Sequence, residues 1–112
     1  MSTHLNIAVV RGIVSSDPQV RELPSGDTVT NVEVTTRLEP GSVSVPVVVH
    51  GAAVTVGAGD EVVVTGRVAR RFFRAGGVTQ SRTELVADAV VRASRAKTVE
   101  QALARVAAEI GR

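Results

Sequence analysis

The two phenylalanines of the chain, Phe72 and Phe73, lie next to each other in an arginine-rich segment. They are the only aromatic residues, because tryptophan and tyrosine are absent. Residues 67–77, RVARRFFRAGG, hold four arginines and end in a Gly-Gly pair that suits a tight turn. An arginine can contact a phosphate with two hydrogen bonds, and an aromatic ring can stack on a base. The segment is therefore a candidate binding site for a nucleic-acid strand.

The charge of the chain is unevenly distributed, although the net charge is only +2. No acidic residue interrupts the stretch 67–82, which contains five arginines: Arg67, Arg70, Arg71, Arg74 and Arg82. Twelve of the thirteen basic residues are arginine rather than lysine, which favours planar contacts with phosphates and bases. The alternative is that these arginines form a solvated strand face with no ligand.

Length and composition exclude several classes of protein. With 112 residues the chain has room for one domain. It has no cysteine, so disulfides and thiolate metal sites are excluded, and neither a metal nor a cofactor is expected. No apolar run reaches the length of about 18 residues that a membrane span needs. The first residues, MSTHLNIAVVRG, do not resemble a signal peptide, so we expect a cytoplasmic protein.

Residues that could carry out catalysis are not arranged for it. Asp60 and Glu61 are adjacent, so in a strand they would point to opposite faces and could not act as an acid–base pair. The sequence GAGDEV (57–62) lacks the full dinucleotide-binding pattern. We therefore expect a binding protein and not an enzyme.

The strand pattern predicts an all-β body. Twenty-four residues are valine, a β-branched residue that favours strands. Alternating and valine-rich segments predict five strands, at residues 4–14, 28–37, 42–50, 60–73 and 78–91. Residues 15–27 are rich in turn formers, and residues 51–60 leave space for one helical turn at most. Gly66 predicts a bulge or sharp bend in the fourth strand, so we expect a small five-stranded barrel.

Strand alternation separates the two rings. Phe72 and Phe73 should point to opposite faces, so only one of them is expected to meet a base. We expect Phe73 to stack and Phe72 to pack in the core. The alternative is that both rings fill the end of the barrel or a subunit contact.

The C-terminal residues predict a helix at 98–110. Four apolar residues recur at helical spacing: Val99, Leu103, Val106 and Ile110. Thr98 and Gln101 predict a capping box, and Gly111 predicts the end of the helix. The apolar stripe needs a partner, either the barrel of the same chain or another subunit. We therefore divide the chain into a barrel at 1–92 and a helical extension at 93–112.

The order of several short motifs resembles the bacterial single-stranded DNA-binding protein family. The similar segments are residues 6–36, 59–73 and 83–91, and the resemblance covers about residues 5–92. The motifs are Arg11-Gly12, Asp17-Pro18 followed by Arg21, Ser25-Gly26, Asn31, Thr65-Gly66-Arg67, and Glu84 to Asp88. The resemblance implies an oligonucleotide/oligosaccharide-binding (OB) barrel that usually forms a homotetramer. It also implies that Phe73 lies at a position where the family offers a stacking aromatic.

The chain departs from this family where the family binds most strongly. Ser44 and His50 stand where aromatics are usual, and of these two only His50 could stack. The family's acidic C-terminal tip has no counterpart in this sequence. As a short single barrel without an acidic tip, and in the segment VPVVVHG (45–51) with its proline, the chain is also similar to primosomal replication protein N. These departures predict DNA binding that is weaker than in typical members.

Together, these features predict a single-stranded DNA-binding protein acting in replication, recombination or repair. The residues expected to contact DNA are Arg11, Arg37, His50, Arg67, Arg70, Arg71, Phe73, Arg74 and Arg82. Expected partners are single-stranded DNA, further copies of the chain in a homotetramer or homodimer, and a protein partner bound through residues 98–110. The alternative is an oligomeric protein–protein interaction module with little DNA binding.

Overall fold

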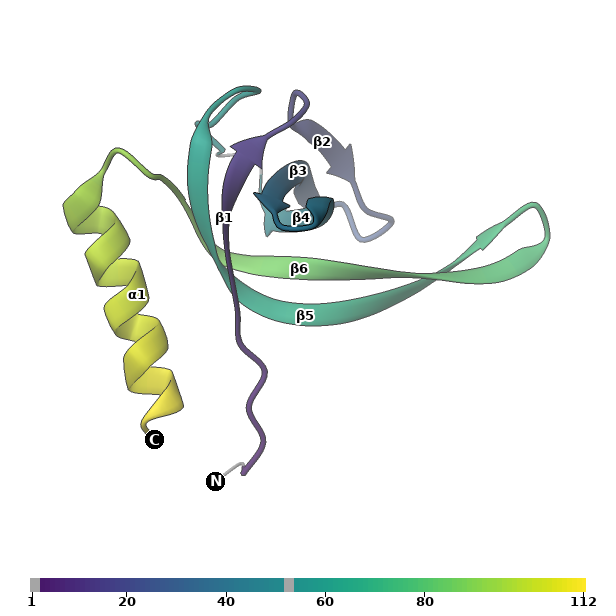
Figure 1. Ribbon diagram of the computed structural model, residues 1–112. Helices are drawn as coiled ribbons and strands as arrows, with labels where there is room; N and C mark the ends of the chain where they lie inside the picture. Colours follow the sequence, from purple (N-terminus) through teal and green to yellow (C-terminus); the bar gives the residue numbers. More distant parts are fainter. Residues whose placement is uncertain (1–2, 52–53) are drawn as a thin grey trace.

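Six strands and one helix make up the computed structural model, which describes residues 3–51 and 54–112 (Figure 1). The strands are β1 (Ala8–Val14), β2 (Gln19–Glu22), β3 (Thr28–Leu38), β4 (Gly41–His50), β5 (Glu61–Ala75) and β6 (Val78–Arg92), and the helix is α1 (Ala96–Ile110). In residues 51–60, Ala52 and Ala53 lie outside the described residues, and the rest contains a turn and no helix.

The strands form one sheet that closes on itself. Their order is β1-β5-β6-β4-β3-β2, and β1 also pairs with β3 at Ile13 and Val14. A short parallel pairing joins β4 to β6 at Val47 and Val48. The result is a closed barrel of five strands, with β2 added at the outer edge of β3. This arrangement is an OB fold, so the prediction of an all-β barrel with a C-terminal helix is confirmed.

Near the N-terminus, two of the predictions about strands are wrong. The turn-rich segment contains the extra strand β2, whose only large apolar residue, Val20, is exposed, so no hydrophobic alternation marked it. The first strand begins at Ala8 and not at residue 4. Before it, the Asn6 side chain takes the place of a strand backbone: its amide donates to the Val68 carbonyl at 2.7 Å and accepts from the Val68 N–H at 2.9 Å.

The barrel interior consists almost entirely of valine. Its buried cluster is Val14, Val32, Val34, Val47, Val56, Val62, Val64 and Leu85. Burying such side chains is worth about 1.5–3 kcal/mol each. Because the two phenylalanines are not part of this core, the aromatic rings remain available outside the barrel.

Gly66 marks the point where β5 bends. The pairing of β5 with β6 shifts register between Thr65 and Gly66, because Thr65 pairs with Ala89 and Gly66 pairs with Ala87. The irregularity lies at Gly66 as predicted, but the extra residue, Asp88, is on β6 and not on the strand that contains the glycine. A Cβ atom at Gly66 would lie 2.0 Å from the carbonyl oxygen of Val86 and 2.9 Å from Cα of Ala87. No other residue fits such a close approach of two backbones.

Beyond this bend, β5 and β6 continue as a two-stranded arm that projects from the barrel (Figure 1). The arm ends in a two-residue turn at Gly76 and Gly77, which have φ angles of 60° and 78°. Positive φ at both residues suits a tight hairpin turn and favours glycine. The prediction that Phe72 packs in the core is wrong: Phe72 lies in the arm and is 66% exposed. Side chains that alternate along a strand point into a core only where the strand lines the barrel. The part of β5 that contains Phe72 does not line the barrel, so neither of its faces is a core face.

The helix α1 begins at Ala96, two residues earlier than predicted. The residue that caps its start is Arg95, with no side-chain hydrogen bond, and Thr98 already lies within the helix, so the predicted capping box is wrong. Gly111 ends the helix, as predicted. The helix lies against β5 and β6 and buries only Ala102, while Leu103 and Ile110 stay exposed. No helix of the described residues is long and apolar enough to cross a membrane.

Substitution of Gly66 should test the importance of the bend. We expect Gly66→Ala to lower the free energy of unfolding by roughly 1–3 kcal/mol, because the added methyl group overlaps the β6 backbone. Urea unfolding measures the change. The matched control is Gly57→Ala, where a Cβ would meet nothing within 4 Å and where we expect a change of about 0.5 kcal/mol or less. Equal stabilities of the two variants would contradict the close approach of β5 and β6.

Candidate nucleic-acid interface

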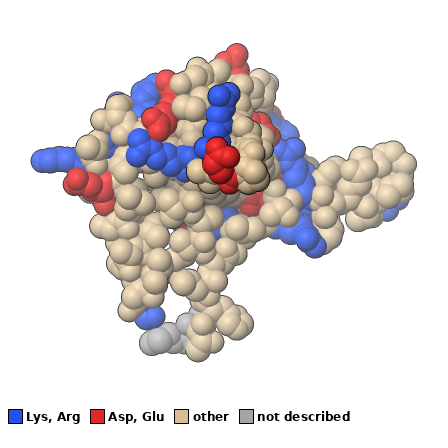
Figure 2. Space-filling view, in the orientation of Figure 1, with Lys and Arg blue, Asp and Glu red and all other residues tan. Residues whose placement is uncertain are grey.

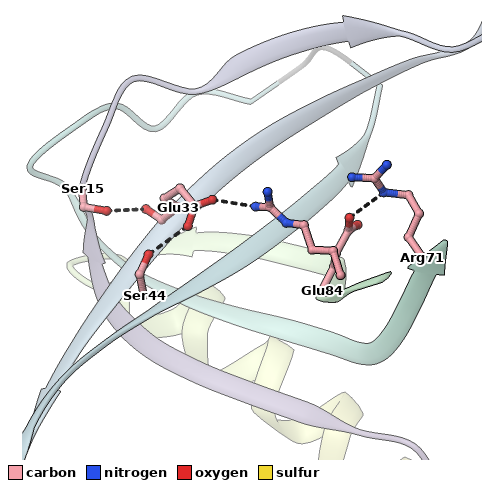
Figure 3. A network of polar contacts seen from close by, with 6 residues as sticks. Ser15, Glu33, Ser44, Arg71 and Glu84 are labelled. Carbon is pink, nitrogen blue, oxygen red and sulfur yellow. Dashed lines mark hydrogen bonds and ion pairs between the residues drawn. The ribbon is translucent and has the colours of Figure 1, made fainter. Parts of the chain in front are cut away.

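A polar network crosses the sheet from β3 to the base of the arm (Figure 3). On β3, the carboxylate of Glu33 accepts hydrogen bonds from Arg82 Nη2 and from Ser44 Oγ, both at 2.8 Å. Its backbone oxygen accepts from the Ser15 hydroxyl at 3.2 Å. Glu33 therefore ties β3 to β4, to β6 and to the segment after β1.

The second part of the network links β6 to β5. Arg71 Nε donates to Glu84 Oε1 at 2.7 Å, and the Glu84 side chain is only 7% exposed. The guanidinium of Arg71 also lies over the ring of Phe73, with Cζ 5.0 Å from the ring centroid. This distance is within the range of a cation–π interaction. Phe73 is partly buried and Phe72 is exposed, so of the two rings it is Phe73 that the structure holds in place.

These contacts explain how two arginines can lie side by side. Arg71 and Arg82 are direct cross-strand partners in β5 and β6, a pairing that like charges disfavour. Each has its own carboxylate, Glu84 for Arg71 and Glu33 for Arg82. A phosphate must therefore compete with a carboxylate at both of the arginines, which were predicted to contact DNA.

Sequence reasoning missed the role of both acids. Glu84 begins one of the family-like motifs, but no partner was predicted for it, and Glu33 is only one polar residue of the strand predicted at 28–37. The stretch 67–82 lacks acids, but two of its five arginines pair with acids outside it: Arg71 with Glu84, just beyond the stretch, and Arg82 with Glu33, which is 49 positions away. Only the strand register brings them together, and that register depends on the bulge and the turn.

The opposite face of the arm carries Arg70, Phe72 and Arg74, which alternate with Arg71 and Phe73 along β5. Among residues 3–51 and 54–112, no ion pair involves Arg70 or Arg74, and Arg74 donates to the carbonyl of Gly77 at 2.7 Å. The visible face of the molecule shows basic side chains gathered where the arm leaves the barrel (Figure 2). The arm thus has one face with paired charges and one with unpaired charges.

One of the predicted site residues, Arg11, lies at the corner before β5 and away from the arm. Arg11 on β1 pairs with Glu61 at 2.8 Å, at the opposite end of β5, and this contact raises the pKa of Arg11. Nearby, the backbone N–H of Gly57 at 2.8 Å lowers the pKa of Asp60, with a further contribution from Arg92. These charges stabilise the corner before β5, so Arg11 is not brought together with the arm arginines.

The remaining predicted residues are spread over three places. Arg67 lies at the groove between the barrel and α1, which has a volume of about 420 Å³ and is also lined by Asp88 and Arg105. Arg37 lines a surface pocket at the β3–β4 hairpin. His50 is exposed at the far end of β4. The structure therefore brings together the arm residues at positions 70–74 and 82 and leaves Arg11, Arg37, His50 and Arg67 apart from them. No group of three or more potential metal ligands occurs in the described part of the chain.

Comparison with known proteins adds one finding. No protein-family model and no curated protein matches the chain in sequence. Among solved structures, it is similar to an SSB from Plasmodium falciparum in complex with single-stranded DNA, with a TM-score of 0.67 and 19% identity. The likeness covers 82% of this chain and 97% of that chain. The two chains share the OB fold. At this identity, the likeness concerns the fold.

The ion pair between Arg71 and Glu84 should matter for stability. We expect Arg71→Ala to lower the free energy of unfolding by about 1–3 kcal/mol, because it leaves a buried carboxylate without its charged partner. Arg70→Ala, on the opposite face of the same strand, should cost about 0.5 kcal/mol or less.

Urea unfolding compares these two variants, and a Glu84→Gln background tests the origin of the difference. In that background Arg71→Ala should cost less, since the buried charge has been removed. The interpretation is wrong if Arg71→Ala and Arg70→Ala destabilise the protein equally.

Proposed function

We propose that this protein binds single-stranded DNA with the β5–β6 arm and the adjoining sheet face, by arginine–phosphate contacts and limited base stacking. One observation carries the proposal: the only two aromatic rings lie outside the core, among arginines, on an arm of an OB barrel. The similar structure from Plasmodium falciparum is a complex with single-stranded DNA, which supports the same ligand class here.

Both faces of the arm contribute to this binding. Phe73 lies with Arg71 on one face, and Phe72 lies between Arg70 and Arg74 on the other. Stacking on an aromatic ring is worth about 1–3 kcal/mol per base. If a base stacks on each of the two rings, stacking contributes roughly 2–6 kcal/mol to the binding free energy. Contacts with phosphates must supply the rest of the affinity.

The paired charges limit that electrostatic part. If all five arginines of residues 67–82 contacted a phosphate, log K would fall with log salt at a slope of about −3.5, at about 0.7 per contact. Arg71 and Arg82 are held by carboxylates, and Arg67 lies in the groove beside α1. We therefore count only Arg70 and Arg74, which lie on the arm and have no ion pair in the described chain. Two contacts give a slope of about −1.4. Binding is therefore salt-sensitive but weak.

Assembly and cellular role are part of the same proposal. Exposed apolar side chains on and before β1 offer a contact for further copies of the chain: Leu5, Val9 and Ile13. A homodimer or homotetramer multiplies the number of arms along one DNA strand and so raises the affinity by avidity. The proposal includes a role in replication, recombination or repair, the processes that expose single-stranded DNA, and the cytoplasmic location expected from the sequence.

A second candidate function is a protein–protein interaction module. Leu103 and Ile110 are exposed on α1 and form an apolar face that the barrel leaves uncovered. This apolar face is the observation that supports a protein partner. The pairing of Arg71 and Arg82 with carboxylates also supports this second candidate, because it reduces the charge available to DNA. Binding to single strands distinguishes the two candidates.

Titration with labelled oligothymidine, followed by fluorescence anisotropy at two salt concentrations, tests the proposal. We expect salt-sensitive binding that prefers the single strand to a duplex of the same length. Phe73→Ala should lower the affinity by roughly 5- to 150-fold, the equivalent of one lost stacking contact. Phe72→Ala reports on the opposite face of the arm by the same measurement. An absence of binding to single strands even at low salt would refute DNA binding and favour the protein–protein candidate.

A further inference from the structure

Three side chains at the base of the arm form a continuous chain of contacts. Glu84 is buried and accepts a hydrogen bond from Arg71 at 2.7 Å, and the Arg71 guanidinium lies over the Phe73 ring at 5.0 Å. Glu84 and Arg71 lie on neighbouring strands, and Phe73 follows Arg71 on the same face of β5. The order is therefore carboxylate, guanidinium, ring.

The buried end of this chain fixes the exposed end. Glu84 is 7% exposed and has little space to move, whereas the Arg71 side chain is 41% exposed and would otherwise sample many rotamers. The ion pair uses Nε of Arg71, so the guanidinium is held by the nitrogen nearest to its stem. The planar group is thereby kept over the ring of Phe73.

We infer that Arg71 and Phe73 act together as one stacking platform for a DNA base, and that Glu84 is the residue that positions it. This inference rests on the proposed binding of single-stranded DNA. The planar guanidinium and the ring each present a flat surface on which a base can stack. Arg71 therefore contributes to base contacts, and its positive charge is already balanced by Glu84.

The platform makes a specific prediction for Arg71→Lys. Lysine keeps the positive charge and can still pair with Glu84, but it has no planar group to stack. The probes are an oligothymidine and an abasic oligomer with the same number of phosphates. We expect Arg71→Lys to weaken binding to oligothymidine by about two- to fivefold and to leave binding to the abasic oligomer unchanged. The matched control is Arg92→Lys, whose carboxylate partner Asp60 lies at the corner before β5 and away from the arm, and it should change neither affinity.

Glu84→Gln tests the positioning role. The variant keeps the shape of the side chain but weakens its hold on Arg71, so we expect a lower affinity for oligothymidine and no loss for the abasic oligomer. A merely structural role would weaken both affinities together or neither. Thermal unfolding monitored by circular dichroism confirms that the variant is folded at the temperature of the titration.

A double-mutant cycle tests whether the two residues form one unit. If they do, the double variant Arg71→Lys/Phe73→Ala binds oligothymidine no more weakly than Phe73→Ala alone. Additive losses, or an Arg71→Lys variant that binds like the wild type, would overturn the platform while leaving DNA binding in place. If the wild-type protein binds neither probe, it is the proposed function that fails.

Discussion

The close approach of β5 and β6 at Gly66 is the constraint on which the rest of the structure depends. The lack of a side chain lets the Val86 carbonyl come so near that β5 bends and shifts register there. Before the bend, β5 is a barrel strand whose valines are buried on pairing with β1. After the bend, the same strand forms one half of the projecting arm, and its side chains do not belong to the barrel core. One glycine thus separates the part of the strand that stabilises the fold from the part that can contact a ligand.

The barrel supports the arm with small side chains and a few polar contacts. Its interior is filled with valine, so the fold needs no aromatic ring for its core. On the outside, Glu33 connects three strands, and Glu84 holds Arg71 at the root of the arm. The same carboxylates that allow two arginines to be cross-strand neighbours also reduce the charge that a DNA strand meets. The carboxylates that hold these arginine side chains in place therefore also weaken the electrostatic attraction between this surface and DNA.

Much of the fold could be predicted from the sequence, because valine alternation, Gly66 and the apolar spacing of 98–110 are local signals. The strand β2 gave no such signal, since Val20 is exposed and its pairing depends on β3. Phe72 was placed in the core because alternation implies an inner face, which an arm outside the barrel does not have. For the candidate site, the arginines and phenylalanines in the sequence indicated where a ligand could bind, but the sequence did not show which carboxylates pair with the arginines. The distance in sequence between Arg82 and Glu33 hid their ion pair, and only the register of the folded sheet joins them.

The turn at Gly76 and Gly77 has a consequence for how this segment can change in evolution. Two residues connect Ala75 to Val78, so the turn leaves no slack in the hairpin. Inserting or deleting one residue of β5 between Gly66 and Arg71 would exchange the two faces of β5 and move Arg71 away from Glu84. The length of the arm can therefore change only by an even number of residues in each strand if this surface is kept. Related sequences that keep this surface should show no single-residue gaps here.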